Sequence, residues 1–240
     1  MITYQDRIKS MRDTKIKHTL QKKRQNGYTD LDDFNGVPVS IFNLDSTEET
    51  LSYDLSRGII NDGRIDDFLR ALNESLGAYK RLNAKAMIVL VGERELYNEE
   101  NCYNVLKAAI PFLEKENVNL IIEPLNNIDR VGYSMPYAKP IFELIRKLNS
   151  PHIKMLYDIY HQNMMGDFSI DDIKENIDII GHFHVADCPG RHEPGTGNVD
   201  YVKIISEINK LDYKGYIGLE YRATIEDEKT FGFLQEVNNV

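Results

Sequence analysis

The stretch IIGHFHVADCPGRHEPGTGNVDY, residues Ile179–Tyr201, joins an apolar run with two histidines to a loop rich in glycine, proline and charged residues. His182 and His184 are two positions apart, so on an extended strand their imidazoles lie on the same side. We expect His184 at the strand end, and His182 one layer lower as a supporting or core residue. A polar strand end that continues into a Gly/Pro loop is typical of α/β active sites.

Five further apolar runs along the chain predict buried strands of the same kind. Their near-continuous Val, Ile and Leu content favours a parallel sheet that is covered by helices. The helices expected between them carry apolar residues at spacings of three and four. The predicted strands are Val37–Asn43, Ala86–Gly92, Val118–Pro124, Ile153–Ile159, Ile179–Asp187 and Tyr216–Tyr221. The predicted helices are Ile65–Leu82, Asn101–Asn117, Tyr137–Leu148, one that starts at Ser169, and Tyr201–Leu211.

The alternation of strand and helix, without a break in composition, predicts a single α/β domain over residues 1–240. Six strands fit an open doubly wound sheet or most of an eight-stranded (β/α)8 barrel. No glycine-rich phosphate fingerprint follows any strand, which disfavours the nucleotide-binding open sheet. Residues 1–36 are atypical, because the first 25 positions hold eight Lys or Arg against two Asp and no convincing apolar strand. This basic segment predicts a solvated helix face, or else a subunit contact or an anion-attracting arm.

Composition disfavours several classes of protein. A net charge of −9 argues against a general nucleic-acid binder. No apolar run approaches the ~18 residues of a transmembrane helix, and the polar N-terminus lacks the apolar core of a secretory signal. Cys102 and Cys188 do not make a disulfide framework, so a cytoplasmic location is expected. We expect Cys188 to be a buried, small apolar side chain.

Acidic or imidazole residues close four consecutive predicted strands. In a parallel barrel these strand ends gather at one rim. Three carboxylates would repel one another there unless a cation neutralised them, so the pattern predicts a divalent metal site suited to Mn²⁺, Mg²⁺ or Co²⁺. Taken singly, each residue has another explanation, such as a solvated carboxylate, a helix N-cap or a hydrogen-bonded core histidine. The four are Glu123, Asp158, His184 and Glu220.

Two further residues are candidates for contact with a substrate. His161 follows Asp158 by three positions and can reach the same rim. Arg191 lies in the loop after the two histidines, where its guanidinium could bind a carboxylate in a forked geometry. Alternatively, Arg191 pairs with Glu193 or Asp187 and only braces the loop.

These segments resemble the hydroxypyruvate isomerase family of the xylose-isomerase-like barrel superfamily. The resemblance is carried by LIIEPLN at 120–126, KMLYDIYHQNMMGD at 154–167, HFHVADCPGRHEPGTGNVDY at 182–201 and GYIGLEY at 215–221, and it extends from about residue 37 to the end. It implies a (β/α)8 barrel whose N-terminal strand is irregular or missing here. An open seam would expose strand edges, and pairing with another subunit could cover them. It also implies that the divalent metal is held by Glu123, Asp158, His184 and Glu220.

The implied activity is isomerisation of a small 2-keto or 2-hydroxy carbonyl compound through an enediolate, with hydroxypyruvate to tartronate semialdehyde as the first expectation. Glu123 and Glu220 are the expected acid/base pair, and His161, Arg191 and Glu193 the expected substrate-binding residues. Alternatives are a ketose 3-epimerase, a non-catalytic barrel that binds metal or a small ligand, and an apurinic-site endonuclease, which six His and the acidic charge disfavour. The expected partners are a small keto acid or ketose and further copies of the chain, without nucleic acid or membrane.

Overall fold

A single six-stranded sheet forms the centre of the structure, a computed structural model that describes residues 39–93, 95–226, 229–230 and 232–233. The strands lie in the sheet in chain order, and every neighbouring pair is parallel. This order confirms the parallel α/β barrel class and excludes a doubly wound sheet, in which the strand order reverses. The strands are β1 (Ile41–Asn43), β2 (Ala86–Leu90), β3 (Leu120–Glu123), β4 (Ile153–Asp158), β5 (Ile180–Val185) and β6 (Tyr216–Leu219).

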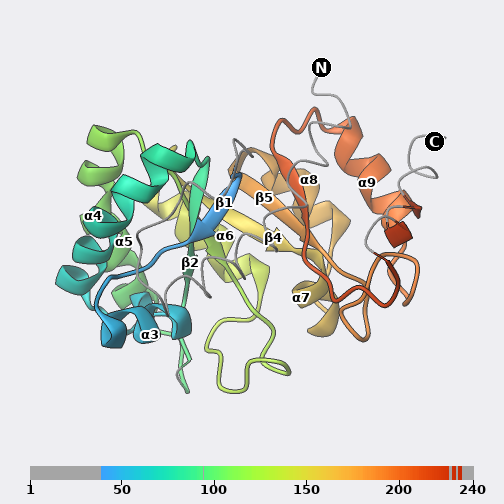
Figure 1. The fold of residues 1–240 in the computed structure, drawn as a ribbon, viewed down its shortest axis with the longest axis horizontal. Helices are drawn as coiled ribbons and strands as arrows, with labels where there is room; N and C mark the ends of the chain where they lie inside the picture. Colours follow the sequence, from blue (N-terminus) through green and yellow to red (C-terminus); the bar gives the residue numbers. More distant parts are fainter. Residues whose placement is uncertain (1–38, 94, 227–228, 231, 234–240) are drawn as a thin grey trace.

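Helices connect successive strands and flank the sheet. In Figure 1, α4 and α5 lie to the left of the strands, and α8 and α9 lie to the right. The helices are α3 (Glu49–Arg57), α4 (Ile65–Leu82), α5 (Glu99–Glu116), α6 (Ala138–Leu148), α7 (Ile159–Met164), α8 (Ile170–Asn176) and α9 (Tyr201–Lys210), with short 3-10 turns at Ile60–Asp62 and Ile177–Ile179.

The core has two parts, because side chains alternate between the two faces of each strand. The larger part lies between strands and helices and includes fully buried Phe68, Leu106 and Phe183. The smaller part draws on the opposite face of β1 to β4. It consists of Ile41, Ala86, Ile88, Ile121 and Leu156.

The sheet is curved, as the positions of Glu123 and Glu220 show. Glu123 ends β3 and Glu220 follows β6, three strands away in the sheet. In a flat sheet, strands that far apart would be separated by roughly 14 Å. Their carboxylate oxygens instead lie within 4.8 Å of each other. Only a sheet that bends toward a barrel brings these strand ends together.

The predicted elements are confirmed, with small differences at their ends. Every predicted strand is present, α4 has the predicted bounds, and Ser169 caps α8 by accepting a hydrogen bond from Asp172 N at 3.1 Å. Helices α3 and α7 were not predicted. The Ser46-Thr-Glu-Glu49 stretch before α3 has the Ser-x-x-Glu spacing of a helix start, a signal that the helix prediction did not use. Helix α7 has only six residues, too few to show a helical period.

The two edges of the sheet are not joined within the described residues, where β1 pairs with β2 and β6 pairs with β5. This part of the chain therefore supplies six strands of the eight in a complete barrel. The basic segment 1–36 lies outside the described residues. In the described part, no helix is long and apolar enough to cross a bilayer. A cytoplasmic location and self-association stay predictions.

Candidate metal and active site

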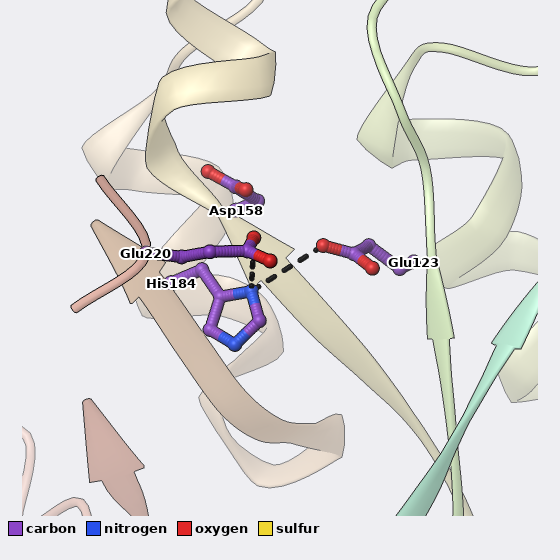
Figure 2. Close-up of side chains that lie close together, drawn as sticks. All are labelled: Glu123, Asp158, His184 and Glu220. Carbon is purple, nitrogen blue, oxygen red and sulfur yellow. Dashed lines mark ion pairs between the residues drawn. The ribbon is translucent and has the colours of Figure 1, made fainter. Parts of the chain in front are cut away.

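The four strand-end residues meet at one point of the rim. Glu123 and Asp158 are the last residues of β3 and β4, His184 lies near the end of β5, and Glu220 directly follows β6. Each offers one ligand atom, and these atoms all lie within 4.8 Å of one another. Figure 2 shows a nitrogen of the His184 ring facing the carboxylates of both Glu123 and Glu220, with Asp158 above them in the view. Glu123, Asp158 and His184 are at most 4% exposed, and Glu220 is half-buried.

The spacing and chemistry of the cluster fit a divalent cation. Two ligand atoms on opposite sides of one ion, at ~2.2 Å from it, are about 4.4 Å apart. Carboxylate oxygens and an imidazole nitrogen suit Mg²⁺, Mn²⁺ and related ions. Three buried or half-buried carboxylates in contact also need positive charge, which a bound cation would supply.

Two basic side chains, His184 and Arg191, already offset part of the negative charge of the three carboxylates. Nδ1 of His184 lies 3.1 Å from Glu220 Oε2 and 3.4 Å from Glu123 Oε1. Burial disfavours the charged ring, but the two carboxylates outweigh it and raise the pKa of His184 to about 10. Without a bound cation, these two carboxylates favour the positively charged form of His184. A metal ion bound at Nδ1 would take the place of this proton.

Arg191 supplies the second positive charge. Its Nη2 donates to Glu220 Oε2 at 2.8 Å and lies 3.7 Å from Asp158 Oδ2. Burial opposes the charge, but these carboxylates raise the pKa of Arg191 further above its usual value. The proposed alternative, in which the guanidinium pairs with Glu193 or Asp187, is wrong: only the backbone N of Arg191 contacts Asp187, at its carbonyl oxygen.

Asp158 both caps a helix and faces the cluster. Its Oδ1 accepts hydrogen bonds from Tyr160 N at 2.8 Å and His161 N at 3.3 Å, which begins α7. Its Oδ2 faces His161 Nε2 at 3.4 Å. The N-cap and metal-ligand interpretations of this residue are therefore compatible. The same cap also directs His161 toward the rim.

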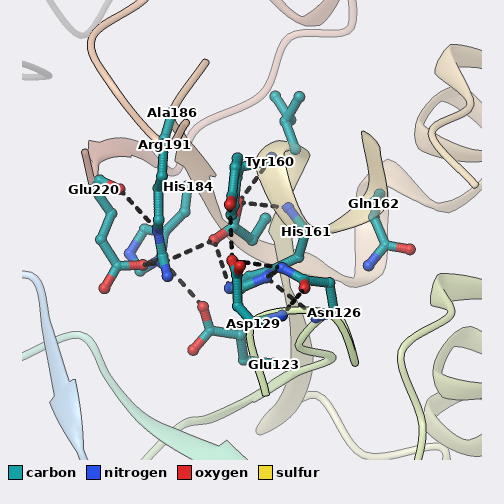
Figure 3. A network of polar contacts seen from close by, with 12 residues as sticks. Glu123, Asn126, Asp129, Tyr160, His161, Gln162, His184, Ala186, Arg191 and Glu220 are labelled. Carbon is teal, nitrogen blue, oxygen red and sulfur yellow. Dashed lines mark hydrogen bonds and ion pairs between the residues drawn. The ribbon is translucent and has the colours of Figure 1, made fainter. Parts of the chain in front are cut away.

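His161 presents a hydrogen-bond donor to the cavity. Its Nδ1 accepts the backbone N–H of Asn126 at 3.1 Å, so a neutral ring carries its proton on Nε2. Within the described residues Nε2 has no hydrogen-bond partner, although the side chain is 1% exposed. Figure 3 shows this ring held between Asn126 and the carboxylate cluster. Asp158 Oδ2 lies 3.4 Å from this nitrogen without forming a hydrogen bond, and contact of His161 with a substrate stays a prediction.

A cavity of about 660 Å³ opens beside these groups. Its lining includes the carboxylates Glu123 and Glu220 together with His161, His184 and Arg191. It also includes residues of α4 and β1, so it extends toward the side of the sheet where β1 and β6 are not paired with each other. The apolar walls and few convergent polar groups are typical of a small-molecule site.

Glu193 does not line this cavity. Its carboxylate accepts from Thr224 N at 3.0 Å and from the Thr224 hydroxyl, and the residue is 3% exposed. These contacts tie the loop after β5 to the segment after β6. They support a bracing role, and direct contact of Glu193 with a substrate stays a prediction.

The loop that carries Arg191 folds around the buried carboxylate of Asp187. This carboxylate accepts from the backbone N–H groups of Cys188 at 2.9 Å, Gly195 at 2.7 Å and Val199 at 3.1 Å. The turn leaves Cys188 half-buried, with its Sγ 3.3 Å from the sulfur of Met164. The expectation of a buried Cys188 is therefore wrong, because the loop leaves the barrel directly after Asp187.

His182 lies beneath His184, as predicted, and both pack against a glycine. The two rings meet edge to face with centroids 5.1 Å apart, and burial together with the charge of His184 lowers the pKa of His182. A Cβ on Gly218 would lie 2.8 Å from His182 Nε2 and 2.9 Å from His184 Cδ2. Only glycine therefore leaves room for both rings.

We expect Gly218→Ala to destabilise the chain by about 1–3 kcal/mol, because the added methyl must displace a buried imidazole. Urea unfolding measures this change. Gly77→Ala is the matched control, since Gly77 lies in α4 with no atom within 4 Å of its added Cβ. That change should stabilise the chain by about 0.5–1 kcal/mol. Equal stability of Gly218→Ala and the wild type would contradict the close packing of these rings.

Asn126, Asp129 and Tyr160 belong to the polar surroundings of the site but carry no strand-end signal. Asn126 ends the LIIEPLN stretch, in the loop after β3. Asp129 Oδ2 accepts from the Tyr160 hydroxyl at 2.7 Å and from Asn126 Nδ2 at 3.1 Å. Their contacts join the loop after β3 to the start of α7, which sequence spacing does not reveal.

Comparison with known proteins agrees with this geometry. The family model described as xylose isomerase-like TIM barrel matches residues 21–236. The chain is 31% identical over 171 residues to the hydroxypyruvate isomerase of Escherichia coli strain K12, covering 69% of this chain and 66% of that protein. It is 28% identical over 179 residues to the 2-oxo-tetronate isomerase of Pectobacterium atrosepticum, covering 72% and 68%. The matches thus span about two thirds of the length of these relatives.

A solved structure described as an AP endonuclease, family 2, from Brucella melitensis is similar in fold, with a TM-score of 0.74 over 85% of this chain and 80% of that one. At 23% identity it supports the architecture alone. The family match covers nearly all of the described residues, and the parallel strands and their converging rim agree with it. The chain belongs to the xylose isomerase-like TIM barrel family.

Proposed function

We propose that this chain is a metal-dependent isomerase of small 2-keto acids, with conversion of hydroxypyruvate to tartronate semialdehyde as its reaction. The observation that carries the proposal is the convergence of Glu123 and Glu220 on His184 Nδ1, at 3.4 and 3.1 Å. Two carboxylates that converge on one point can remove a proton from one carbon of a bound substrate and return it to the next. Asp158 and His184 complete the cluster.

The reaction moves hydrogen without net oxidation. A proton leaves C3 of hydroxypyruvate, a C–H bond forms at C2, and the hydroxyl proton passes from the C3 oxygen to the C2 oxygen. A divalent cation bound by the four residues would stabilise the negative charge that develops on the substrate oxygens. Either Glu123 or Glu220 takes the C3 proton, and the same carboxylate or the opposite one delivers it to C2.

His161 and Arg191 orient the substrate in this scheme. His161 lines the cavity, and its Nε2 forms no hydrogen bond within the described residues although Asp158 Oδ2 lies 3.4 Å away, so it can donate to a substrate oxygen. Arg191 is the only arginine that contacts the carboxylate cluster in the described part of the chain, and its side chain is 25% exposed. Its guanidinium can therefore offer a further N–H edge to a substrate carboxylate.

The choice of substrate is supported by the relatives named above. Hydroxypyruvate and 2-oxo-tetronate both carry a carboxylate, a 2-keto group and a hydroxyl on the next carbon. An arginine at the rim suits the carboxylate that both share. A cavity of about 660 Å³ has room for either, so 2-oxo-tetronate belongs in the same test.

The test is exchange of substrate C–H for solvent deuterium, followed by NMR. The chain is incubated in D₂O with hydroxypyruvate, 2-oxo-tetronate or a neutral ketose, with Mg²⁺, Mn²⁺ or EDTA, and the metal is removed before spectra are taken. We expect metal-dependent exchange at C3 of hydroxypyruvate, with formation of tartronate semialdehyde. Exchange confined to ketoses, with inversion at C3, would identify a ketose 3-epimerase instead. Metal binding without exchange of any substrate would indicate a non-catalytic barrel.

A further inference from the structure

The guanidinium of Arg191 lies between a carboxylate and an aromatic ring. On one side, Nη2 donates to Glu220 Oε2 at 2.8 Å. On the other, its carbon lies 5.1 Å from the centroid of the Tyr160 ring, within the range of a cation–π contact. Figure 3 shows Arg191 between Glu220 and the aromatic ring of Tyr160. Carboxylate and ring together restrict the plane of the guanidinium.

The Arg191 backbone is fixed as well. Its N–H donates to the Asp187 carbonyl at 3.0 Å, and its own carbonyl accepts from Arg222 N at 2.8 Å. Its φ of 56° lies in the left-handed region, which an arginine adopts only when its surroundings hold it there. The side chain therefore leaves the loop from a defined point, and its end lies between Glu220 and the Tyr160 ring.

Tyr160 is itself anchored from a separate loop. The residue is 3% exposed, its N–H donates to Asp158 Oδ1 at 2.8 Å, and its hydroxyl donates to Asp129 Oδ2 at 2.7 Å. Burial works against ionisation of Asp129, but hydrogen bonds from Asn126 and Tyr160 hold its pKa below the usual value. The acceptor thus stays charged at neutral pH and keeps the ring in one orientation.

We infer that Tyr160, anchored by Asp129, is a positioning residue that aims Arg191 at the carboxylate of the substrate. This inference rests on the proposed function for the identity of the substrate class, 2-keto acids. The contact between ring and guanidinium is a property of the chain itself and can be measured without turnover. Tyr160 and Asp129 act through Arg191 and are not assigned a contact with the reacting atoms.

The first measurement is the ¹H–¹⁵N signal of the Arg191 Nε–H group, assigned by its loss in Arg191→Lys. We expect an upfield ring-current shift in the wild type that disappears in Tyr160→Leu. Tyr160→Phe keeps the ring but lacks the hydroxyl. The Arg191 signal in this variant should therefore retain part of the upfield shift and broaden. Tyr157→Phe removes a buried hydroxyl elsewhere in the barrel, and its Arg191 signal should match the wild type. An unchanged Arg191 signal in Tyr160→Leu overturns the inference.

The second measurement is binding of glyoxylate, a 2-keto acid without an enolisable carbon, to the Mg²⁺-loaded chain. Loss of the cation–π contact in Tyr160→Leu should weaken glyoxylate binding roughly three- to thirty-fold. Binding of neutral dihydroxyacetone should change little. Equal weakening of both ligands, or no glyoxylate binding by the wild type, overturns the assignment to the substrate carboxylate. If only the isomerase proposal fails, deuterium exchange is absent. Tyr160→Leu then still weakens glyoxylate binding without weakening dihydroxyacetone binding.

Discussion

Glu123→Gln and Glu220→Gln are each expected to lower metal-dependent deuterium exchange by about 100-fold or more, the usual range for loss of a general acid or base being 10²–10⁴. Glutamine keeps the shape of the side chain but cannot accept a proton from carbon. Both carboxylates reach His184 Nδ1, at 3.4 and 3.1 Å, so each is placed to exchange a proton with a substrate bound at this cluster. Exchange is measured by NMR on hydroxypyruvate at saturating Mg²⁺.

Weaker metal binding would also lower deuterium exchange, because each substitution removes an anionic metal ligand. Asp158→Asn is the matched control: it removes the same charge from the same cluster, while an amide oxygen at this position can still cap α7. At saturating metal, Asp158→Asn should retain more exchange than either glutamine variant. Undiminished exchange in both glutamine variants would remove Glu123 and Glu220 as the acid/base pair.

Addition of Mg²⁺ or Mn²⁺ at about 100 times its dissociation constant is expected to stabilise the folded chain by about 2.7 kcal/mol. For a chain of this size the increase corresponds to roughly 5–10 °C in Tm. The physical reason is that the folded chain gathers three carboxylates and one imidazole within 4.8 Å, an arrangement that the unfolded chain lacks. Thermal unfolding followed by circular dichroism, with and without EDTA, measures the shift.

Asp158→Asn should also reduce this metal-dependent shift. If affinity falls a hundredfold at the same metal concentration, the stabilisation drops to about 0.4 kcal/mol. Asp200→Asn is the control for the change of cap residue, because Asp200 caps α9 by accepting from Lys203 N at 3.0 Å, outside the cluster. Its metal shift should equal that of the wild type. A full metal-dependent shift in Asp158→Asn would show that the ion binds elsewhere.

The sequence by itself determined the strands, most of the helices and the four residues at the strand ends. Apolar runs and helical spacing are local patterns, so they can be recognised without knowledge of distant contacts. The chain direction in a parallel sheet then places Glu123, Asp158, His184 and Glu220 at one rim. For this reason the candidate metal cluster could be predicted before any coordinates.

Only the tertiary structure decided how the surrounding residues are paired. Arg191 contacts Glu220, 29 positions away, and His161 contacts Asn126, 35 positions away. Contacts of this kind depend on how loops fold across the rim, and sequence proximity offered Glu193 or Asp187 as partners of Arg191 instead. Curvature of the sheet, through which β3 and β6 meet at one point, is likewise a collective result of packing between strands and helices rather than a property of any one segment.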